Sequence, residues 1–286
     1  MSEAAKLAAL KIAAHIPAAI WRPVGSALSA WLSWREPNAV KQWQLNYEVA
    51  TGQRPSPAQT RAGMRSWFRN TVGSLQLGKW SPEKINRLVY VAPDDAERLR
   101  EHRRETGLVL ALPHMGSWDM AGAWACLNGL PVTSVAEKLP AGQFEYFSGI
   151  RERLGFQIFS HKTSGLVPKL CEQINQGRVV CLVADRDFSR RGAKVTWPGA
   201  KQEFEMTMPP GCALIAERTG AVVVPVAPWF DGSVMRIHIG QAITPPDGAD
   251  QVAYITQAMA SYFAEQIAAH PVDWHMMQRF FPGVRP

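Results

Sequence analysis

Two kinds of hydrophobic pattern divide the chain near residue 105. Before that point, apolar residues recur at helical spacing. Ser56-Pro57-Ala58-Gln59 has the features of a helix start, because Ser56 can cap, proline suits the first turn and Gln59 occupies the capping-box position. Ser81-Pro82-Glu83-Lys84 repeats the pattern. From Thr106 onward, short apolar runs alternate with helical segments, which predicts a helical N-terminal region followed by an α/β unit.

The short apolar runs predict strands at 107–112, 132–135, 156–159, 179–184 and 221–227, and the alternating segment 234–239 is typical of an edge strand. Helices are predicted at 167–176, 210–218 and 251–269. Continuous apolar strands between helices are characteristic of parallel strands buried on both faces. We therefore predict an α/β fold with a central, largely parallel or mixed sheet covered by helices on both faces. We find no linker long enough to separate two domains, so we expect a single domain over residues 1–286.

The first 34 residues combine apolar and basic positions. They are rich in Ala, Leu, Ile and Trp, but charged residues and prolines interrupt every long apolar run, so we expect no transmembrane helix. The pattern predicts two amphipathic helices split near Pro23, with Lys6 and Lys11 on a polar stripe. Trp31 and Trp34 favour a bilayer interface. Residues 1–34 are thus predicted to associate with a membrane. A signal peptide and ordinary packing helices are the competing interpretations.

Charge and cysteine content indicate which partners and which compartment suit the protein. The formal net charge is +7, which suits an anionic partner such as acidic lipid, nucleic acid or a phosphorylated substrate. The four cysteines form no CxxC pair, and three lie in apolar stretches, which favours a reducing cytoplasm over a disulfide framework. Arg61, Arg65 and Arg69 recur every four residues, as on a solvated helix face.

The most informative candidate for chemistry is His114, which directly follows the predicted strand 107–112. Reactive groups gather at the carboxyl ends of strands in such sheets. Gly116 permits a tight turn, Ser117 can cap a helix, and Asp119 then falls in the first turn of that helix. We expect the Asp119 carboxylate to accept a hydrogen bond from one ring nitrogen of His114, leaving the other as a base. The spacing alone is weak, since seven histidines and 24 acidic residues in 286 give about 0.6 chance matches (7 × 24/286).

The surrounding sequence makes this pattern more specific. His114-xxxx-Asp119, the run 132–138 and Ala184-Asp185-Arg186-Asp187 after another strand resemble the glycerolipid and lipid A acyltransferase superfamily. The blocks 111–119, 130–137, 151–156, 185–189 and 270–275 resemble the phosphatidylinositol mannoside acyltransferases of actinobacteria.

This resemblance implies a reaction and its partners. The donor would be a long-chain acyl-CoA, such as palmitoyl-CoA, and the acceptor a mannose hydroxyl of a phosphatidylinositol mannoside. The histidine would deprotonate the hydroxyl, and the alkoxide would attack the thioester. The chemistry requires an oxyanion site, for which N–H groups near Gly116 or Arg186 are candidates, but no metal or redox cofactor. The protein would lie peripherally on the cytoplasmic face of the cell membrane, against an anionic surface and without nucleic acid.

The resemblance also implies roles for particular side chains. Glu137 and Arg151 would contact the acceptor headgroup, and Asp185 or Asp187 would assist His114 or the acceptor. Ion pairs without a functional role are the alternative for each. CoA phosphates would lie against a basic group or against the helix start after residues 208–211. The basic group comprises Arg190, Arg191 and Lys194.

Three other functions remain open. A lauroyl or myristoyl transferase acting on lipid A belongs to the same superfamily, although Asp273-Trp274-His275 and an Asp where that branch commonly has Glu argue against it. A hydrolase would need a Ser or Cys nucleophile, and we find no Gly-x-Ser-x-Gly elbow. A non-catalytic lipid- or nucleic-acid-binding protein would explain the charge but leaves His114 without a role.

Overall fold

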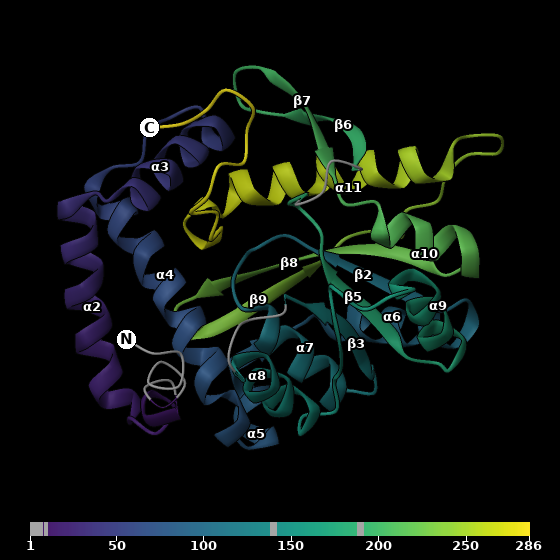
Figure 1. Cartoon of the computed structure of the whole chain (residues 1–286), viewed down its shortest axis with the longest axis horizontal. Coiled ribbons are helices and arrows are strands. Elements are labelled where there is room, and N and C mark those ends of the chain that lie inside the picture. The colour runs from purple at the N-terminus through teal and green to yellow at the C-terminus, as the bar shows by residue number, and fades with distance from the viewer. Residues whose placement is uncertain (1–7, 9–10, 138–141, 188–191) are drawn as a thin grey trace.

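The computed structural model describes residues 8, 11–137, 142–187 and 192–286. A seven-stranded sheet in the order β1-β9-β8-β2-β5-β3-β4 crosses its centre (Figure 1). The neighbouring pairs are parallel except β8 and β9, so the predicted largely parallel, mixed α/β sheet is confirmed. The strands are β1 (Val89–Tyr90), β2 (Leu108–Leu112), β3 (Val132–Ala136), β4 (Gln157–Ser160), β5 (Val179–Val183), β8 (Val222–Asp231) and β9 (Val234–Ile239).

Helices cover both faces of this sheet (Figure 1). The first face carries α9 (Leu166–Asn175), α10 (Gly211–Thr219) and α11 (Gln251–Ala269). The second carries α5 (Pro82–Leu88), α6 (Pro93–Glu105) and α7 (Trp118–Leu127), and α8 (Gln143–Glu152) contacts β4. At the side of the sheet lie α2 (Ala18–Arg35), α3 (Asn38–Thr51) and α4 (Pro57–Gln76).

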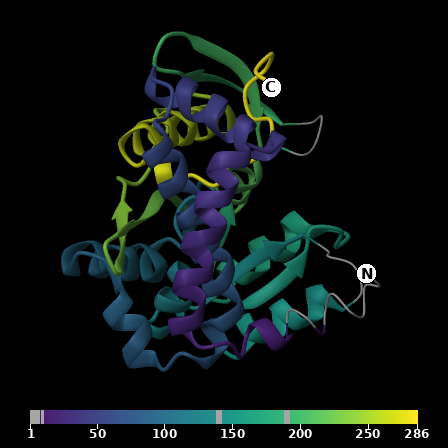
Figure 2. The same cartoon turned by 90° about the vertical axis from the view of Figure 1, so that its left-hand side faces the viewer.

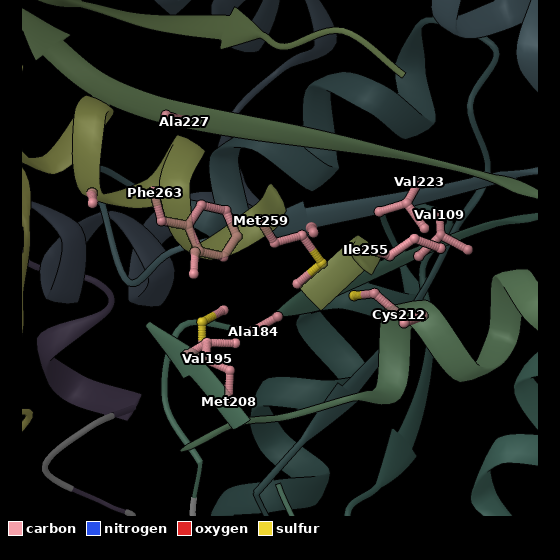
Figure 3. Packing of buried hydrophobic residues seen from close by; sticks show 14 of the residues in the cluster. Val109, Ala184, Val195, Met208, Cys212, Val223, Ala227, Ile255, Met259 and Phe263 are labelled. Atoms are coloured by element: carbon pink, nitrogen blue, oxygen red, sulfur yellow. The ribbon is translucent and has the colours of Figure 1, made fainter. Parts of the chain in front are cut away.

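Strand β2 explains why both faces are covered. All five of its residues are buried. Because successive strand side chains point to opposite faces, Val109 and Ala111 join the core under α9–α11, whereas Leu108, Leu110 and Leu112 join the core under α5–α7. Figure 3 shows the first of these cores, where side chains from β2, β8, α10 and α11 meet. Burial on both faces therefore accounts for the unbroken apolar sequence of the strand.

The predicted elements agree with the structure to within a few residues, with three exceptions. Pro23 does not split the N-terminal helices but lies inside α2, which begins after Pro17. Segment 234–239 forms β9 but is not an edge strand, since the two-residue β1 pairs along its outer side. The segment around Lys194, for which no strand was predicted, forms β6 (Ala193–Pro198), which pairs with β7 (Glu203–Met208).

The N-terminal helices pack through a separate small core of Val40, Trp43, Tyr47 and Met64. The Ser56 capping box predicted for α4 is present, with reciprocal bonds between Ser56 and Gln59. Figure 2 shows α2 running along one side of the molecule. None of the helices among the described residues combines the length and hydropathy required to cross a membrane.

Candidate active site

His114 and Asp185 lie side by side because their strands are neighbours in register. Leu112 of β2 pairs with Val183 of β5, and each candidate residue follows its strand by two positions. The ladder continues past the strands, where the Ala184 N–H donates to the Leu112 carbonyl at 2.8 Å. The result is a contact of 2.5 Å between His114 Nδ1 and Asp185 Oδ1, although 71 residues separate the two in sequence.

The hydrogen bonds of Asp185 define the tautomer of His114. An ionised carboxylate only accepts hydrogen bonds, so His114 Nδ1 carries the proton and Nε2 holds the free lone pair. Nε2 has no hydrogen-bond partner among the described residues, and the His114 side chain is 27% exposed while that of Asp185 is fully buried. Burial alone would raise the pKa of Asp185, but the His114 ring and hydrogen bonds from His114 and Trp274 hold it below its ordinary value. His114 is thus arranged as a general base backed by a carboxylate.

The expectation that Asp119 orients His114 is wrong. Asp119 lies in the first turn of α7, as predicted, but its carboxylate pairs with Arg151 of α8, at 2.7 Å to Nε and 3.1 Å to Nη2. Burial alone would lower the pKa of Arg151, but the Asp119 carboxylate raises it above its ordinary value. The turn of the helix directs Asp119 toward α8 rather than back over the histidine. Asp119 and Arg151 therefore form an ion pair between two helices.

Gly116 makes the sharp turn between β2 and α7. Its φ is +53°, and a Cβ there would lie 2.6 Å from the Pro228 carbonyl oxygen, so no larger residue fits. The Gly116 N–H donates to the Asp273 carbonyl at 2.9 Å, which occupies the donor expected to face an oxyanion. Ser117 caps α7 as predicted, accepting from the Met120 N–H.

The other acidic candidates are Asp187 and Glu137, which lie in different parts of the site. Asp187 accepts a hydrogen bond at 3.0 Å from Thr207 in the β6–β7 hairpin, so Asp185 is the carboxylate that reaches His114. Glu137 directly follows β3, the neighbour of β5, and is exposed at the same edge. Burial lowers the pKa of Arg186, and the carboxylates of Asp185 and Glu137 act in the opposite direction, which places the guanidinium in the field of both.

A C-terminal segment after α11 forms the back wall of the site. Trp274, fully buried, donates from Nε1 to Asp185 Oδ2 at 3.1 Å. Met115 and Trp274 form an antiparallel bridge, and the His275 N–H donates to the His114 carbonyl at 2.8 Å. The segment therefore contacts both the histidine loop and its carboxylate.

Behind this wall, three polar side chains form a buried group. The Ser66 hydroxyl of α4 contacts the Asp273 carboxylate closely and lies 2.9 Å from His275 Nε2. Burial raises the pKa of Asp273 and, with nearby His114, lowers that of His275 to about 3. His275 is therefore neutral, and its buried Nδ1 has no hydrogen-bond partner within the described part of the chain.

No pattern in the sequence marks a role for the four residues Ser66, Asp273, Trp274 and His275. The last three stand in the block 270–275 that resembles the acyltransferases, but a tryptophan in such a block gives no sign that its N–H meets a carboxylate 89 residues away. Ser66 carries no local signal, since a serine inside a helix is ordinary.

The parts of the site expected to hold CoA are only partly described. Arg190 and Arg191 lie outside the described residues, and Lys194 is an exposed residue of β6. The helix expected after residues 208–211 is α10, beginning at Gly211. Ala121, Ala123 and Trp124 of α7 are buried in the core between this helix and the sheet. Within the described part of the chain, no cluster of three or more His, Cys, Asp or Glu is arranged to hold a metal ion.

Comparison with known proteins gives a consistent picture. Residues 3–282 match the family described as bacterial lipid A biosynthesis acyltransferase. A phosphatidylinositol mannoside acyltransferase of Mycobacterium tuberculosis (strain CDC 1551 / Oshkosh) is 43% identical over 175 residues, which is 60% of this chain and 54% of the relative. One from Mycolicibacterium smegmatis (strain ATCC 700084 / mc(2)155) is 42% identical over 176 residues, 60% of this chain and 56% of the relative. The chain thus spans about half the length of the curated relatives it matches. With nearly its whole length matched by the family, the chain belongs to the bacterial lipid A biosynthesis acyltransferases.

Proposed function

We propose that this protein transfers a long-chain acyl group, such as palmitoyl, from acyl-CoA to a mannose hydroxyl of a phosphatidylinositol mannoside. The observation that carries the proposal is the His114–Asp185 pair, with Nε2 of the histidine unpartnered among the described residues. The names of the relatives supply the class of acceptor. The donor and its chain length rest on the family resemblance of the sequence.

The chemistry follows from this pair. His114 Nε2 takes the proton of the mannose hydroxyl, and the hydroxyl oxygen bonds to the thioester carbonyl carbon. The tetrahedral intermediate collapses, the C–S bond breaks, and the thiolate takes the proton from the imidazolium to leave as CoA. Asp185 stabilises the imidazolium between the two proton transfers. General base catalysis of this kind contributes about 10²–10⁴-fold to a rate.

The acceptor headgroup would lie at the carboxyl edge of the sheet. Glu137 and Arg186 stand there beside Asp185, and one negative and one positive group would contact sugar hydroxyls and a phosphate. Arg151 already binds Asp119 with Nε and Nη2, which leaves Nη1 for a headgroup oxygen. Asp187 and Gly116 would shape the same edge without direct proton transfer.

A membrane surface is the proposed location, on the cytoplasmic face. Five of the eight large apolar side chains that are exposed among the described residues lie between positions 12 and 34. Four of them, at positions 20, 24, 31 and 34, follow helical spacing along one face of α2. Arg22 and Arg35 are exposed on the same helix, so the surface combines apolar and basic groups as an anionic interface requires.

The reaction is tested by incubating the protein with labelled palmitoyl-CoA and either phosphatidylinositol dimannoside or a lipid A precursor. We expect label in the mannoside, lost in His114→Ala. Label in the lipid A precursor alone would assign the other branch of the family. Free fatty acid released without acceptor would indicate a hydrolase, and transfer unchanged by His114→Ala would contradict the mechanism.

A further inference from the structure

We propose that Trp274 is a positioning residue for the His114–Asp185 pair. Its indole N–H fixes the Asp185 carboxylate in the plane that holds His114 in its reactive tautomer. The contacts of Trp274 are present without substrate. Only the expected effect on the reaction rate rests on the proposed acyl transfer.

The hydrogen bonds of Asp185 give Trp274 this role. Oδ1 faces His114 Nδ1, while Oδ2 accepts from the His114 backbone N–H at 3.0 Å and from Trp274 Nε1 at 3.1 Å. Two of these three donors belong to His114 itself. The indole is therefore the donor that ties the carboxylate to a part of the molecule other than the residue it must orient.

Trp274 is itself held firmly. Its carbonyl accepts a hydrogen bond from Trp43 Nε1 at 2.7 Å, and its ring packs edge-on against Phe280 with ring centres 4.9 Å apart. Its chain neighbours Asp273 and His275 hydrogen-bond through their backbones to Gly116 and His114. A donor fixed in this way is preorganised, so it constrains Asp185 without first having to be ordered.

A matched pair of variants separates positioning from packing. Trp197 is also buried, and its ring centre lies 4.9 Å from Phe280 and 6.2 Å from Phe281, the same distances as for Trp274. Trp197 has no hydrogen bond to His114 or Asp185. Trp274→Phe and Trp197→Phe should therefore lose similar ring packing, but only Trp274→Phe also loses the hydrogen bond to Asp185 and changes the reaction.

The expected kinetic change is specific. In Trp274→Phe, kcat should fall about 10–100-fold, with KM changed by less than about twofold. Without the indole donor, the Asp185 carboxylate keeps more negative charge toward His114. It therefore stabilises the protonated imidazolium of His114 more strongly. The acid limb of the kcat/KM profile should therefore move to higher pH. A profile that coincides with those of the wild type and Trp197→Phe would overturn the proposal.

Proton NMR without substrate tests the positioning role of Trp274 separately from acyl transfer. The proton between His114 Nδ1 and Asp185 should give a low-field proton NMR signal that is absent in His114→Ala and displaced in Trp274→Phe. In Asp185→Asn, the indole N–H signal of Trp274 should move while that of Trp197 stays, and this holds even if Trp274→Phe does not fold. Displaced signals in a protein that transfers no acyl group would reject the proposed function and keep the positioning role. An indole signal unmoved by Asp185→Asn would reject the positioning role.

Discussion

At the scale of single residues, Asp185 has a property that Asp119 lacks: its two oxygens face different kinds of donor. Oδ2 faces two N–H groups that cannot reverse their polarity, from the His114 backbone and Trp274. Oδ1 faces His114 Nδ1, which can either donate or accept. The fixed donors therefore decide how any replacement side chain is oriented.

The substitution Asp185→Asn tests this difference between the donors that face the two oxygens. Its amide oxygen should face the two fixed donors, which puts the amide N–H toward His114 Nδ1. The histidine must then carry its proton on Nε2 and can no longer act as a base. We expect kcat to fall about 10²–10⁴-fold while the protein stays folded, as measured by acyl transfer and circular dichroism. Activity near that of the wild type would show that the histidine does not depend on this carboxylate.

His275 should make stability depend on pH. Its pKa is lowered to about 3 by burial and by His114, whereas the unfolded chain binds a proton near 6.5. Stability is therefore complete above pH 6.5 and is lost as pH falls toward 3. Urea unfolding should give about 2 kcal/mol less stability at pH 5 than at pH 7.5 from this group.

The control for this prediction is a pair of glutamine variants. His275→Gln should flatten the pH dependence by that amount, whereas His15→Gln, at an exposed position, should leave it unchanged. Equal pH dependence in the wild type and His275→Gln would contradict the assignment of a buried neutral histidine.

At the scale of elements, the Asp119–Arg151 pair joins the start of α7 to the end of α8. The two side chains are 6% and 18% exposed, so removing one partner leaves a charge that water cannot fully solvate. Asp119→Ala should lower the free energy of unfolding by about 3–5 kcal/mol in chemical denaturation.

The exposed pair Asp231–Arg236 provides the comparison. Its side chains are 59% and 45% exposed, and Asp231→Ala should cost less than about 1 kcal/mol. Similar losses for both variants would mean that the α7–α8 pair is not the link described here. Neither substitution removes a hydrogen bond to His114.

The strands also show which parts of the fold could be predicted from the sequence. Strands such as β2 were predictable because burial on both faces requires an unbroken apolar run. The β6–β7 hairpin was not predicted: residues 193–198 alternate as strand residues do, but they directly follow a basic run that is typical of a loop. His114 was predictable from its place after β2, but its partner depends on which strand lies beside β2. That choice, β5, is made by tertiary packing, so the nearby Asp119 was selected in error.

At the scale of the whole molecule, the exposed apolar face of α2 is the surface through which we propose that the protein binds a membrane. Trp31 and Trp34 are 53% and 74% exposed. Replacing both with alanine should weaken binding to vesicles containing anionic lipid at least about tenfold in a sedimentation assay, since each buries a large apolar surface at an interface. Binding should also weaken at high salt, because the basic groups contribute through screened attraction.

Tyr254 of α11 offers the matched control, an exposed aromatic residue outside α2. Tyr254→Ala should leave vesicle binding unchanged. Undiminished binding by the double tryptophan variant would return α2 to the role of an ordinary packing helix. Deletion of residues 1–34 would then also leave binding intact.

The contact between Trp274 and Asp185 has a consequence for the order of events during synthesis. A chain leaving the ribosome presents His114 first, then Asp185, and the indole that fixes them only 89 residues later. The sheet strands β2 and β5 can pair before that, yet the back wall of the site must wait for α11 and the segment after it. The proposed catalytic pair is therefore expected to become competent late, when nearly all of the sheet and helices already exist. On the proposed membrane role of α2, a nascent chain would expose its lipid-binding surface before its active site is complete.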